Sequence, residues 1–180
     1  MQNNNIFVVG VGRSGTSLLQ SMLSSHPQIQ SVPETAFLRR YVTKGKLTNL
    51  VLKNKGNHAK KILKNDYKLK RLNFDFLKSF KKFCMSKDNI DFQIYEDFKS
   101  TVCSDHKNIF VDKDPKSIEY IPIINKIFPN SKYIQIIRDP RDVLLSRKKA
   151  AWSKRKSLTI HLVAIYSHLT LGMKTLNDNE

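Results

Sequence analysis

The chain opens on a glycine-rich turn, GVGRSGTS at residues 10–17, which stands between an apolar run and an amphipathic run. The four residues before it, IFVV at 6–9, are apolar and rich in β-branched side chains, which is typical of a buried parallel strand. Apolar residues then recur at helical spacing, at Leu18, Leu19, Met22 and Leu23. A glycine turn between a strand and a helix directs free backbone N–H groups at an anion, so this stretch predicts a phosphate-binding loop.

The turn departs from the nucleoside triphosphate loop G-x-x-x-x-G-K-[ST] at one position. Gly10 and Gly15 have the required spacing, but Thr16 stands where the lysine would be, and the cation comes earlier, at Arg13. A guanidinium group can bind phosphate or sulfate through two parallel hydrogen bonds, and Ser17 adds a hydroxyl donor. We expect a loop for a doubly anionic group that needs neither the lysine nor magnesium. The alternative is a glycine turn that only lets a helix pack on a sheet.

Three further strands are predicted, at residues 28–32, 108–111 and 132–137, with a helix over 117–128 and amphipathic helices after 139 and over 158–173. Asp139 and Pro140 have the residue types of a helix start. Alternating strands and helices predict an α/β fold with a parallel sheet flanked by helices. Ligands of such sheets bind at the carboxyl ends of the strands.

A charged side chain follows each predicted strand where that strand ends. Arg13 follows the first strand, and the others are Glu34, Lys113 and Arg138. Glu34 would face the phosphate loop if the first two strands were parallel neighbours. The ordinary alternative for any one of these residues is a surface salt bridge.

Residues 44–107 have a different composition from the rest of the chain and are strongly basic, with 16 Lys or Arg against 7 Asp or Glu. Apolar and aromatic side chains recur there at steps of three and four, at Leu69, Leu72, Phe76, Phe80 and Phe83 and again at Phe92, Tyr95, Phe98 and Val102. We interpret these stripes as core rather than as a base-stacking surface. The segment is predicted to be a helical insertion or lid on the sheet, which could contact an acceptor.

Length and composition limit the number of domains, the kind of partner, the localisation and the possible metal sites. A chain of 180 residues fits one domain, so residues 1–180 are taken as a single unit. The net charge of +17 favours anionic partners, although most of the lysines are expected to be solvated only. Two cysteines, Cys84 and Cys103, no leader segment and no apolar run of about 18 residues predict a cytoplasmic protein without a membrane span. No cysteine–histidine cluster has the spacing of a metal site, so no metal is expected.

Two motifs of the chain resemble the sulfotransferase family, which moves a sulfuryl group from 3′-phosphoadenosine 5′-phosphosulfate (PAPS). GVGRSGTSLLQSMLSSHP looks like the family's 5′-phosphosulfate loop, and YIQIIRDPRDVLLSR looks like its 3′-phosphate motif. The loop arginine, a Pro-Glu-Thr after the second strand and a Lys-Asp-Pro after the third are similar to the protein-tyrosine sulfotransferase branch and its bacterial relatives. The resemblance implies a P-loop-like sheet and in-line transfer to a hydroxyl or amine acceptor.

The resemblance also implies roles for individual residues. The 5′-phosphosulfate would be held by Arg13, Ser14, Gly15, Thr16 and Ser17. Arg138 and Ser146 would hold the 3′-phosphate of PAPS or of its product, adenosine 3′,5′-bisphosphate.

The catalytic residues would be Glu34 as general base, with Lys113 and Arg13 balancing charge on the leaving phosphate. Arg40 falls where the tyrosine branch has an acceptor-contacting arginine. A second arginine of that branch is replaced by Ala36, which weakens the case for a tyrosine-peptide acceptor.

Several questions stay open on the sequence alone. The acceptor is a small molecule, carbohydrate, lipid or peptide, nucleic acid is not expected, and a homodimer is one assembly that the sequence allows. Family members continue with a further strand and a nucleotide-closing loop, so the chain is expected to be short at its C-terminus. The alternatives are a P-loop kinase, in which Asp112 would help to hold magnesium, and a truncated, non-catalytic nucleotide-binding remnant.

Overall fold

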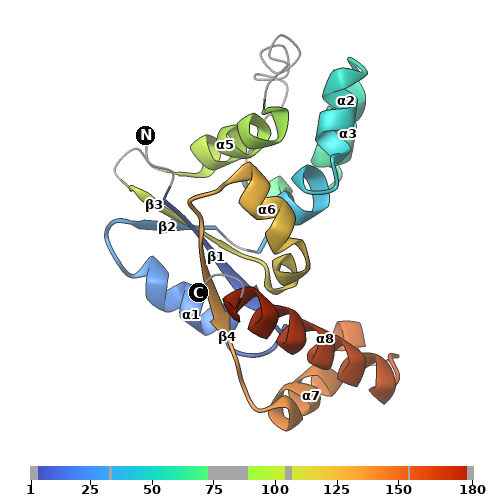
Figure 1. The fold of residues 1–180 in the computed structure, drawn as a ribbon. Helices are drawn as coiled ribbons and strands as arrows, with labels where there is room; N and C mark the ends of the chain where they lie inside the picture. The colour runs from blue at the N-terminus through green and yellow to red at the C-terminus, as the bar shows by residue number, and fades with distance from the viewer. Residues whose placement is uncertain (1–3, 33, 73–88, 104–106, 154, 178–180) are drawn as a thin grey trace.

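A parallel sheet forms the centre of the protein in the computed structural model, which describes residues 4–32, 34–72, 89–103, 107–153 and 155–177 (Figure 1). Within these residues the four strands are β1 (Asn4–Gly10), β2 (Ile29–Ser31), β3 (Ile109–Lys113) and β4 (Lys132–Ile136). Their order in the sheet is β2-β3-β1-β4, and all three pairings are parallel. The predicted parallel α/β sheet is therefore confirmed.

Helices connect the strands along the chain. They are α1 (Thr16–Ser24), η1 (Leu38–Val42), α2 (Lys46–Leu52), α3 (Gly56–Lys64), η2 (Lys70–Leu72), α5 (Ile90–Val102), η3 (Pro115–Tyr120), α6 (Ile121–Ile127), α7 (Pro140–Lys149), η4 (Ala151–Ser153) and α8 (Leu158–Asn177). Asp139 accepts a hydrogen bond from the backbone N–H of Arg141 at 2.8 Å, as expected of the cap of α7. Pro122 lies in the first turn of α6, where its missing N–H costs nothing.

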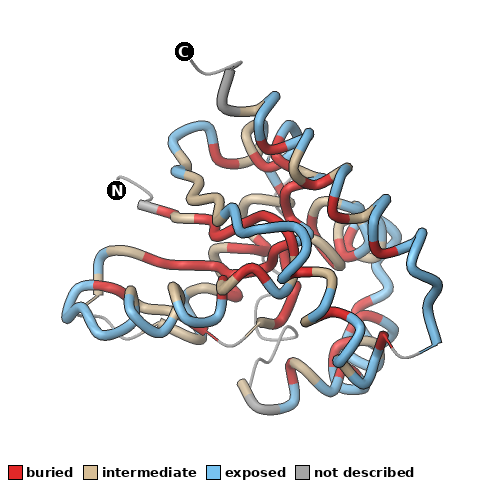
Figure 2. Tube along the Cα trace, turned by 90° about the horizontal axis from the view of Figure 1, so that it is seen from below, coloured by how far each residue is buried: buried red, intermediate tan, exposed pale blue. Residues whose placement is uncertain are grey.

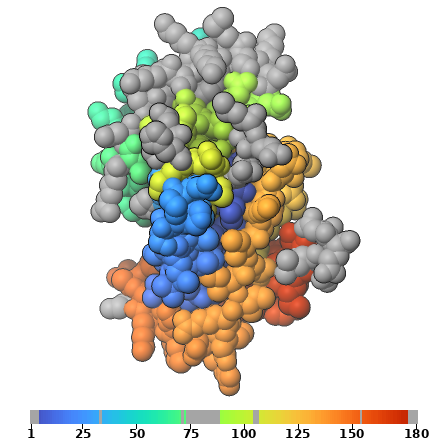
Figure 3. Space-filling view, turned by 90° about the vertical axis from the view of Figure 1, so that its left-hand side faces the viewer, coloured from blue at the N-terminus to red at the C-terminus, as the bar shows by residue number. Residues whose placement is uncertain are grey.

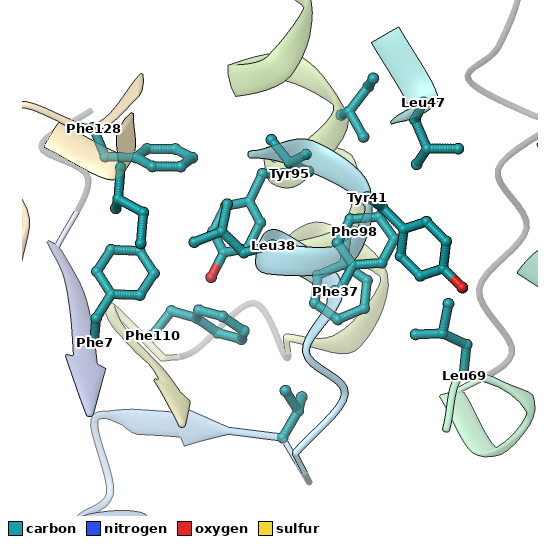
Figure 4. Packing of buried hydrophobic residues seen from close by; sticks show 14 of the residues in the cluster. Phe7, Phe37, Leu38, Tyr41, Leu47, Leu69, Tyr95, Phe98, Phe110 and Phe128 are labelled. Atoms are coloured by element: carbon teal, nitrogen blue, oxygen red, sulfur yellow. The ribbon is translucent and has the colours of Figure 1, made fainter. Parts of the chain in front are cut away.

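The largest core cluster joins one face of the sheet to η1, α2, α3, α5 and α6 (Figure 4). Phe7 of β1 lies near Tyr95 and Phe128, and the rings of Phe37 and Phe98 stack with their centroids 4.1 Å apart. The aromatic stripe of α5 is core, as predicted. The preceding stripe at Phe76, Phe80 and Phe83 lies outside the described residues.

The opposite face of the sheet is covered by α1, whose contact is smaller. Leu19 and Leu23 pack on Val8, Ile29 and Val111. The four apolar residues that recur at helical spacing do not all pack on the sheet, because Leu18 and Met22 are 68% and 63% exposed. Figure 3 views this side of the molecule, with the blue N-terminal residues directly beside the orange residues that contain β4.

A third cluster joins the glycine turn to the last two helices, through Val11, Val143 and Ile165. The helix α8 runs four residues beyond its predicted end. Many of its apolar residues are exposed, and Figure 2 shows exposed positions alternating with more buried ones along it. None of the helices in the described part of the chain is both long and apolar enough to cross a membrane.

Candidate functional site

The loop between β1 and α1 has the backbone of an anion-binding turn. Gly10 has φ +130°, and a Cβ there would lie 3.2 Å from the backbone oxygen of Ile136. Gly15, at φ +106°, precedes α1, and no described side chain caps the first turn of that helix. Arg13 is held at φ +81°, a conformation that a non-glycine residue rarely adopts. The free N–H groups at the start of α1 are therefore available to a negative group.

A pocket of about 610 Å³ lies beside this loop, at the carboxyl ends of the strands. It brings together most of the predicted site residues, namely Arg13, Gly15, Thr16, Ser17, Glu34, Lys113, Arg138 and Ser146. Ser14 and Arg40 are not among the residues that line it. Ser14 is buried, and its hydroxyl has no hydrogen-bond partner among the described residues.

Glu34 and Lys113 form the ion pair of this pocket. The Lys113 Nζ lies 2.7 Å from Glu34 Oε2 and donates to Ser17 Oγ at 3.3 Å, so the ammonium joins the carboxylate to the first turn of α1. Glu34 was expected to face the loop directly only if β1 and β2 were parallel neighbours, and they are not neighbours in the sheet. Instead β3 lies between β2 and β1, and Lys113, at the end of β3, bridges the gap.

Two lysines keep Glu34 ionised. Partial burial is the largest single influence and alone would raise the pKa of this carboxyl, but the hydrogen bond and charge of Lys113, with a smaller contribution from Lys68, lower the pKa below its ordinary value. Lys68 Nζ lies 3.4 Å from Glu34 Oε1. Glu34 is thus a carboxylate at neutral pH and can accept a proton.

The two predicted phosphate-binding places are in direct contact. Arg13 donates through Nε to Ser146 Oγ at 3.1 Å, although 133 positions separate them in sequence. Arg138, at the end of β4, forms an exposed ion pair with Asp142 at 3.2 Å. Because Arg13, Arg138 and Ser146 line one pocket, the opening loop and the β4–α7 turn face the same space.

Arg39, not Arg40, reaches the pocket from the segment after β2. Residues 38–42 form a π-helical turn, with Thr43 N–H bonded to the Leu38 carbonyl at 2.9 Å. Arg39 pairs with Asp114 at 2.6 Å, whereas Arg40 pairs with buried Asp66. An extra residue in a turn shifts the helical phase, so which of the two arginines faces the pocket could not be predicted from the residue pattern.

Further pocket residues were also not predicted. They are Asp114, Lys116, Arg147, Trp152, Lys156 and His168. Burial lowers the pKa of the Arg147 guanidinium, which lies 5.4 Å from the Trp152 ring centroid, and Lys156 lies at the same distance from that ring. Arg147 is the last residue of the quoted 3′-phosphate motif, and Lys156 lies nine residues after it. The basic residues at the end of α7 and just beyond it were therefore the signal that could have found them.

Asp112 does not take the position that the kinase alternative requires. Its carboxylate accepts a hydrogen bond from Tyr95 in the core at 3.0 Å, and it does not line the pocket formed by the described residues. Burial, together with the charge of Asp114, raises the pKa of Asp112 to about 7. In the described part of the chain, no group of three or more His, Cys, Asp or Glu side chains could hold a metal ion.

Known proteins resemble this chain in sequence and in fold. A family model described as the sulfotransferase family matches residues 5–178. A protein of Aquifex aeolicus is 32% identical over 142 residues, which are 78% of this chain and 16% of that one. Protein-tyrosine sulfotransferase 1 of Homo sapiens is 26% identical over 149 residues, covering 79% of this chain and 34% of the human one. The chain thus spans only about a third or less of the length of these relatives.

Among solved structures, the sulfotransferase domain of the Synechococcus PCC 7002 olefin synthase has a similar fold. Its TM-score is 0.60 at 19% identity, and the match covers 97% of this chain and 62% of that one. The likeness supports the P-loop-like α/β fold expected from the sequence.

Proposed function

The chain belongs to the sulfotransferase family, and from this premise we propose that it transfers a sulfuryl group from PAPS to a hydroxyl or amine acceptor. The observation that carries the proposal is the single pocket shared by the glycine loop, the Glu34–Lys113 pair and the Arg138–Ser146 pair. Its volume of about 610 Å³ lies within the range of roughly 300–1,000 Å³ that is usual for ligand sites.

The donor set fits a nucleotide with two anionic ends. The uncapped start of α1, the Thr16 and Ser17 hydroxyls and the Arg13 guanidinium would hold the 5′-phosphosulfate. Arg138 and Ser146 would hold the 3′-phosphate. PAPS would supply the activated sulfuryl group, and the cations of the chain would take the place of a metal.

The chemistry that we propose is in-line displacement. Glu34 accepts the proton of the acceptor while the new bond to sulfur forms and the bond from sulfur to the phosphate oxygen breaks. Lys113 and Arg13 offset the charge that grows on the departing phosphate. Ser17, hydrogen-bonded to Lys113, fixes the ammonium at the start of α1.

The proposal specifies the donor as PAPS but leaves several classes of acceptor. Arg39 lines the pocket, so it takes the acceptor-facing place first given to Arg40. We treat residues 1–180 as one sulfotransferase-like domain in which the described helices of the segment 44–107 could contact the acceptor. A small molecule, carbohydrate, lipid or peptide fits this arrangement, and the matched human enzyme acts on protein tyrosine, as its name says.

Ligand-induced thermal stabilisation tests the proposal. The melting temperature is measured with adenosine 3′,5′-bisphosphate, with ATP plus magnesium, and with neither. A ligand that binds only the folded state raises its stability, so the bisphosphate alone should raise the melting temperature. A shift with ATP and magnesium alone would instead support a kinase. Bisphosphate binding without transfer to any acceptor would support the non-catalytic remnant.

A further inference from the structure

Each carboxylate oxygen of Glu34 contacts a different lysine. Oε2 lies 2.7 Å from Lys113 Nζ, and Oε1 lies 3.4 Å from Lys68 Nζ. Lys113 comes from the sheet and lines the pocket, whereas Lys68 comes from the turn between α3 and η2, in the basic helical segment. The carboxylate is therefore held from two independent parts of the fold.

Buried Asp66 fixes the turn that carries Lys68. Its Oδ1 accepts a hydrogen bond from the backbone N–H of Lys68 at 2.9 Å. Its Oδ2 accepts from Arg40 Nη1 and from the Tyr41 hydroxyl, both at 2.5 Å, and the Asp66 side chain is only 1% exposed. A buried carboxylate with this many donors holds its surroundings in one arrangement.

A hydrophobic anchor secures the other side of the turn. Leu69 is 3% exposed and belongs to the main core cluster, next to η1 (Figure 4). Lys68 thus lies between Asp66 and Leu69, which are both held in place, so its backbone has little conformational freedom. Its side chain is 24% exposed, so it is neither a solvated surface lysine nor part of the core.

We propose that Lys68 is a positioning residue for Glu34, and that Asp66 with Arg40 and Tyr41 keeps Lys68 in place. The inference rests on the proposed function for the role given to Glu34. When Lys113 interacts with the donor phosphate, Lys68 still holds one oxygen of Glu34 and leaves the other for the acceptor proton. Arg40 therefore acts on the site through Asp66 and Lys68, without touching the acceptor.

The titration of Glu34 gives a readout that does not require activity. The groups that face or influence this carboxyl are Lys113, Lys68 and, across β3, Asp112. The chain has four glutamates, so carboxyl-¹³C glutamate labelling gives few NMR signals, and Glu34→Gln identifies the signal of Glu34. Lys68→Met should shift the Glu34 titration to higher pH, and Lys68→Arg should restore it.

The matched control is Lys70→Met, which removes the same charge from an exposed lysine two residues away. It should leave the Glu34 titration close to that of the wild type. Asp66→Asn, which keeps Lys68 but loosens its turn, should produce a smaller upward shift than Lys68→Met. Equal Glu34 titrations in Lys68→Met and Lys70→Met would overturn the proposal.

Bisphosphate binding separates this inference from the proposed function. Lys68 does not line the pocket, so Lys68→Met should show the same melting-temperature rise with adenosine 3′,5′-bisphosphate as the wild type. If no variant responds to the bisphosphate, the proposed cofactor is wrong, but the Glu34 titration still decides the contact with Lys68. If the bisphosphate binds but the Glu34 titration is unchanged in Lys68→Met, only the positioning role of Lys68 is wrong.

Discussion

At the scale of single residues, Glu34 combines two opposed requirements. A general base must be ionised before it accepts a proton, yet strong ion pairing makes a carboxylate a weaker base. Burial counters the pairing here, because the desolvation of Glu34 raises its pKa while the two lysines lower it. The net result is an ionised Glu34 carboxylate, whose lysine partners are free to interact with the phosphate oxygens of a donor when one binds.

Glu34→Gln tests the role of this carboxylate. The amide keeps the shape of the side chain but cannot accept the acceptor proton, so the rate of sulfuryl transfer should fall by roughly 10²–10⁴-fold. The affinity for adenosine 3′,5′-bisphosphate, measured by isothermal titration calorimetry, should stay nearly the same. Glu96→Gln is the control, since Glu96 pairs with Lys99 in α5, away from the pocket lining. Unchanged turnover in Glu34→Gln would remove this residue as the base.

Arg138→Ala tests the 3′-phosphate end. A hydrogen bond to a charged group contributes about 1.5–3 kcal/mol, so the loss should weaken bisphosphate binding by roughly 10- to 150-fold. Adenosine 5′-phosphate, which lacks the 3′-phosphate, should bind almost as before. Arg141→Ala is the matched control, because Arg141 is 88% exposed, pairs with Asp139 and does not line the pocket. Equal losses for both nucleotides would contradict the assignment.

The residues that the sequence could locate are those fixed by strand ends. Lys113 is the last residue of β3, Arg138 comes two residues after β4, and the parallel sheet brings them to one pocket. Arg39 could not be chosen over Arg40, because an extra residue in a π-helical turn decides which of them faces the pocket. Lys68 was not found either, since it reaches Glu34 through tertiary packing of a segment whose lysines all look alike in the sequence.

At the scale of elements, the turn from β1 into α1 depends on local backbone geometry. Gly10 at φ +130° lets the chain leave β1 beside β4, with the backbone oxygen of Ile136 close to where a Cβ would lie. Such a feature can be recognised from glycine spacing, because few other residues adopt it. The strand order could not, since long connections and not local sequence place β3 between β1 and β2.

Gly10→Ala tests the geometry of this turn. The alanine would face both an unfavourable φ and a 3.2 Å contact with a backbone oxygen, so unfolding should become easier by about 1–3 kcal/mol. Urea denaturation measures the change. Gly12→Ala is the control from the same loop, because Gly12 has no positive φ and a Cβ there meets only Arg147 Nη1 at 3.8 Å. Similar losses in both variants would show that the loop is strained throughout.

At the scale of the whole molecule, the two faces of the sheet contribute unequally to the core. The larger cluster ties the sheet to η1 and to α2, α3 and α5 of the segment 44–107, whereas α1 packs on the other face in a smaller cluster. Asp112 is buried at the larger interface and accepts from Tyr95 of α5. A charged Asp112 would destabilise the packing between the sheet and α5, because a buried charge has lost its hydration.

The protonation of Asp112 should therefore make global stability depend on pH. Its pKa is raised to about 7 in the folded protein by burial and by the charge of Asp114, against about 3.9 in an unfolded chain. Between these two values the folded state keeps a proton that the unfolded state releases. The contribution of Asp112 to stability is thus greatest below about pH 4, decreases as pH rises and is lost above about pH 7.

Asp112→Asn isolates this contribution, because the amide keeps an acceptor for Tyr95 but does not titrate. Urea unfolding of both proteins is compared from pH 4 to pH 8, which cancels the effects of the other 14 acidic residues. At 1.36 kcal/mol per pKa unit, the wild type should lose up to roughly 4 kcal/mol relative to the variant across this range. A stability difference that stays constant with pH would mean that Asp112 keeps its charge in the core, and that Tyr95 and Lys113 stabilise the charge fully.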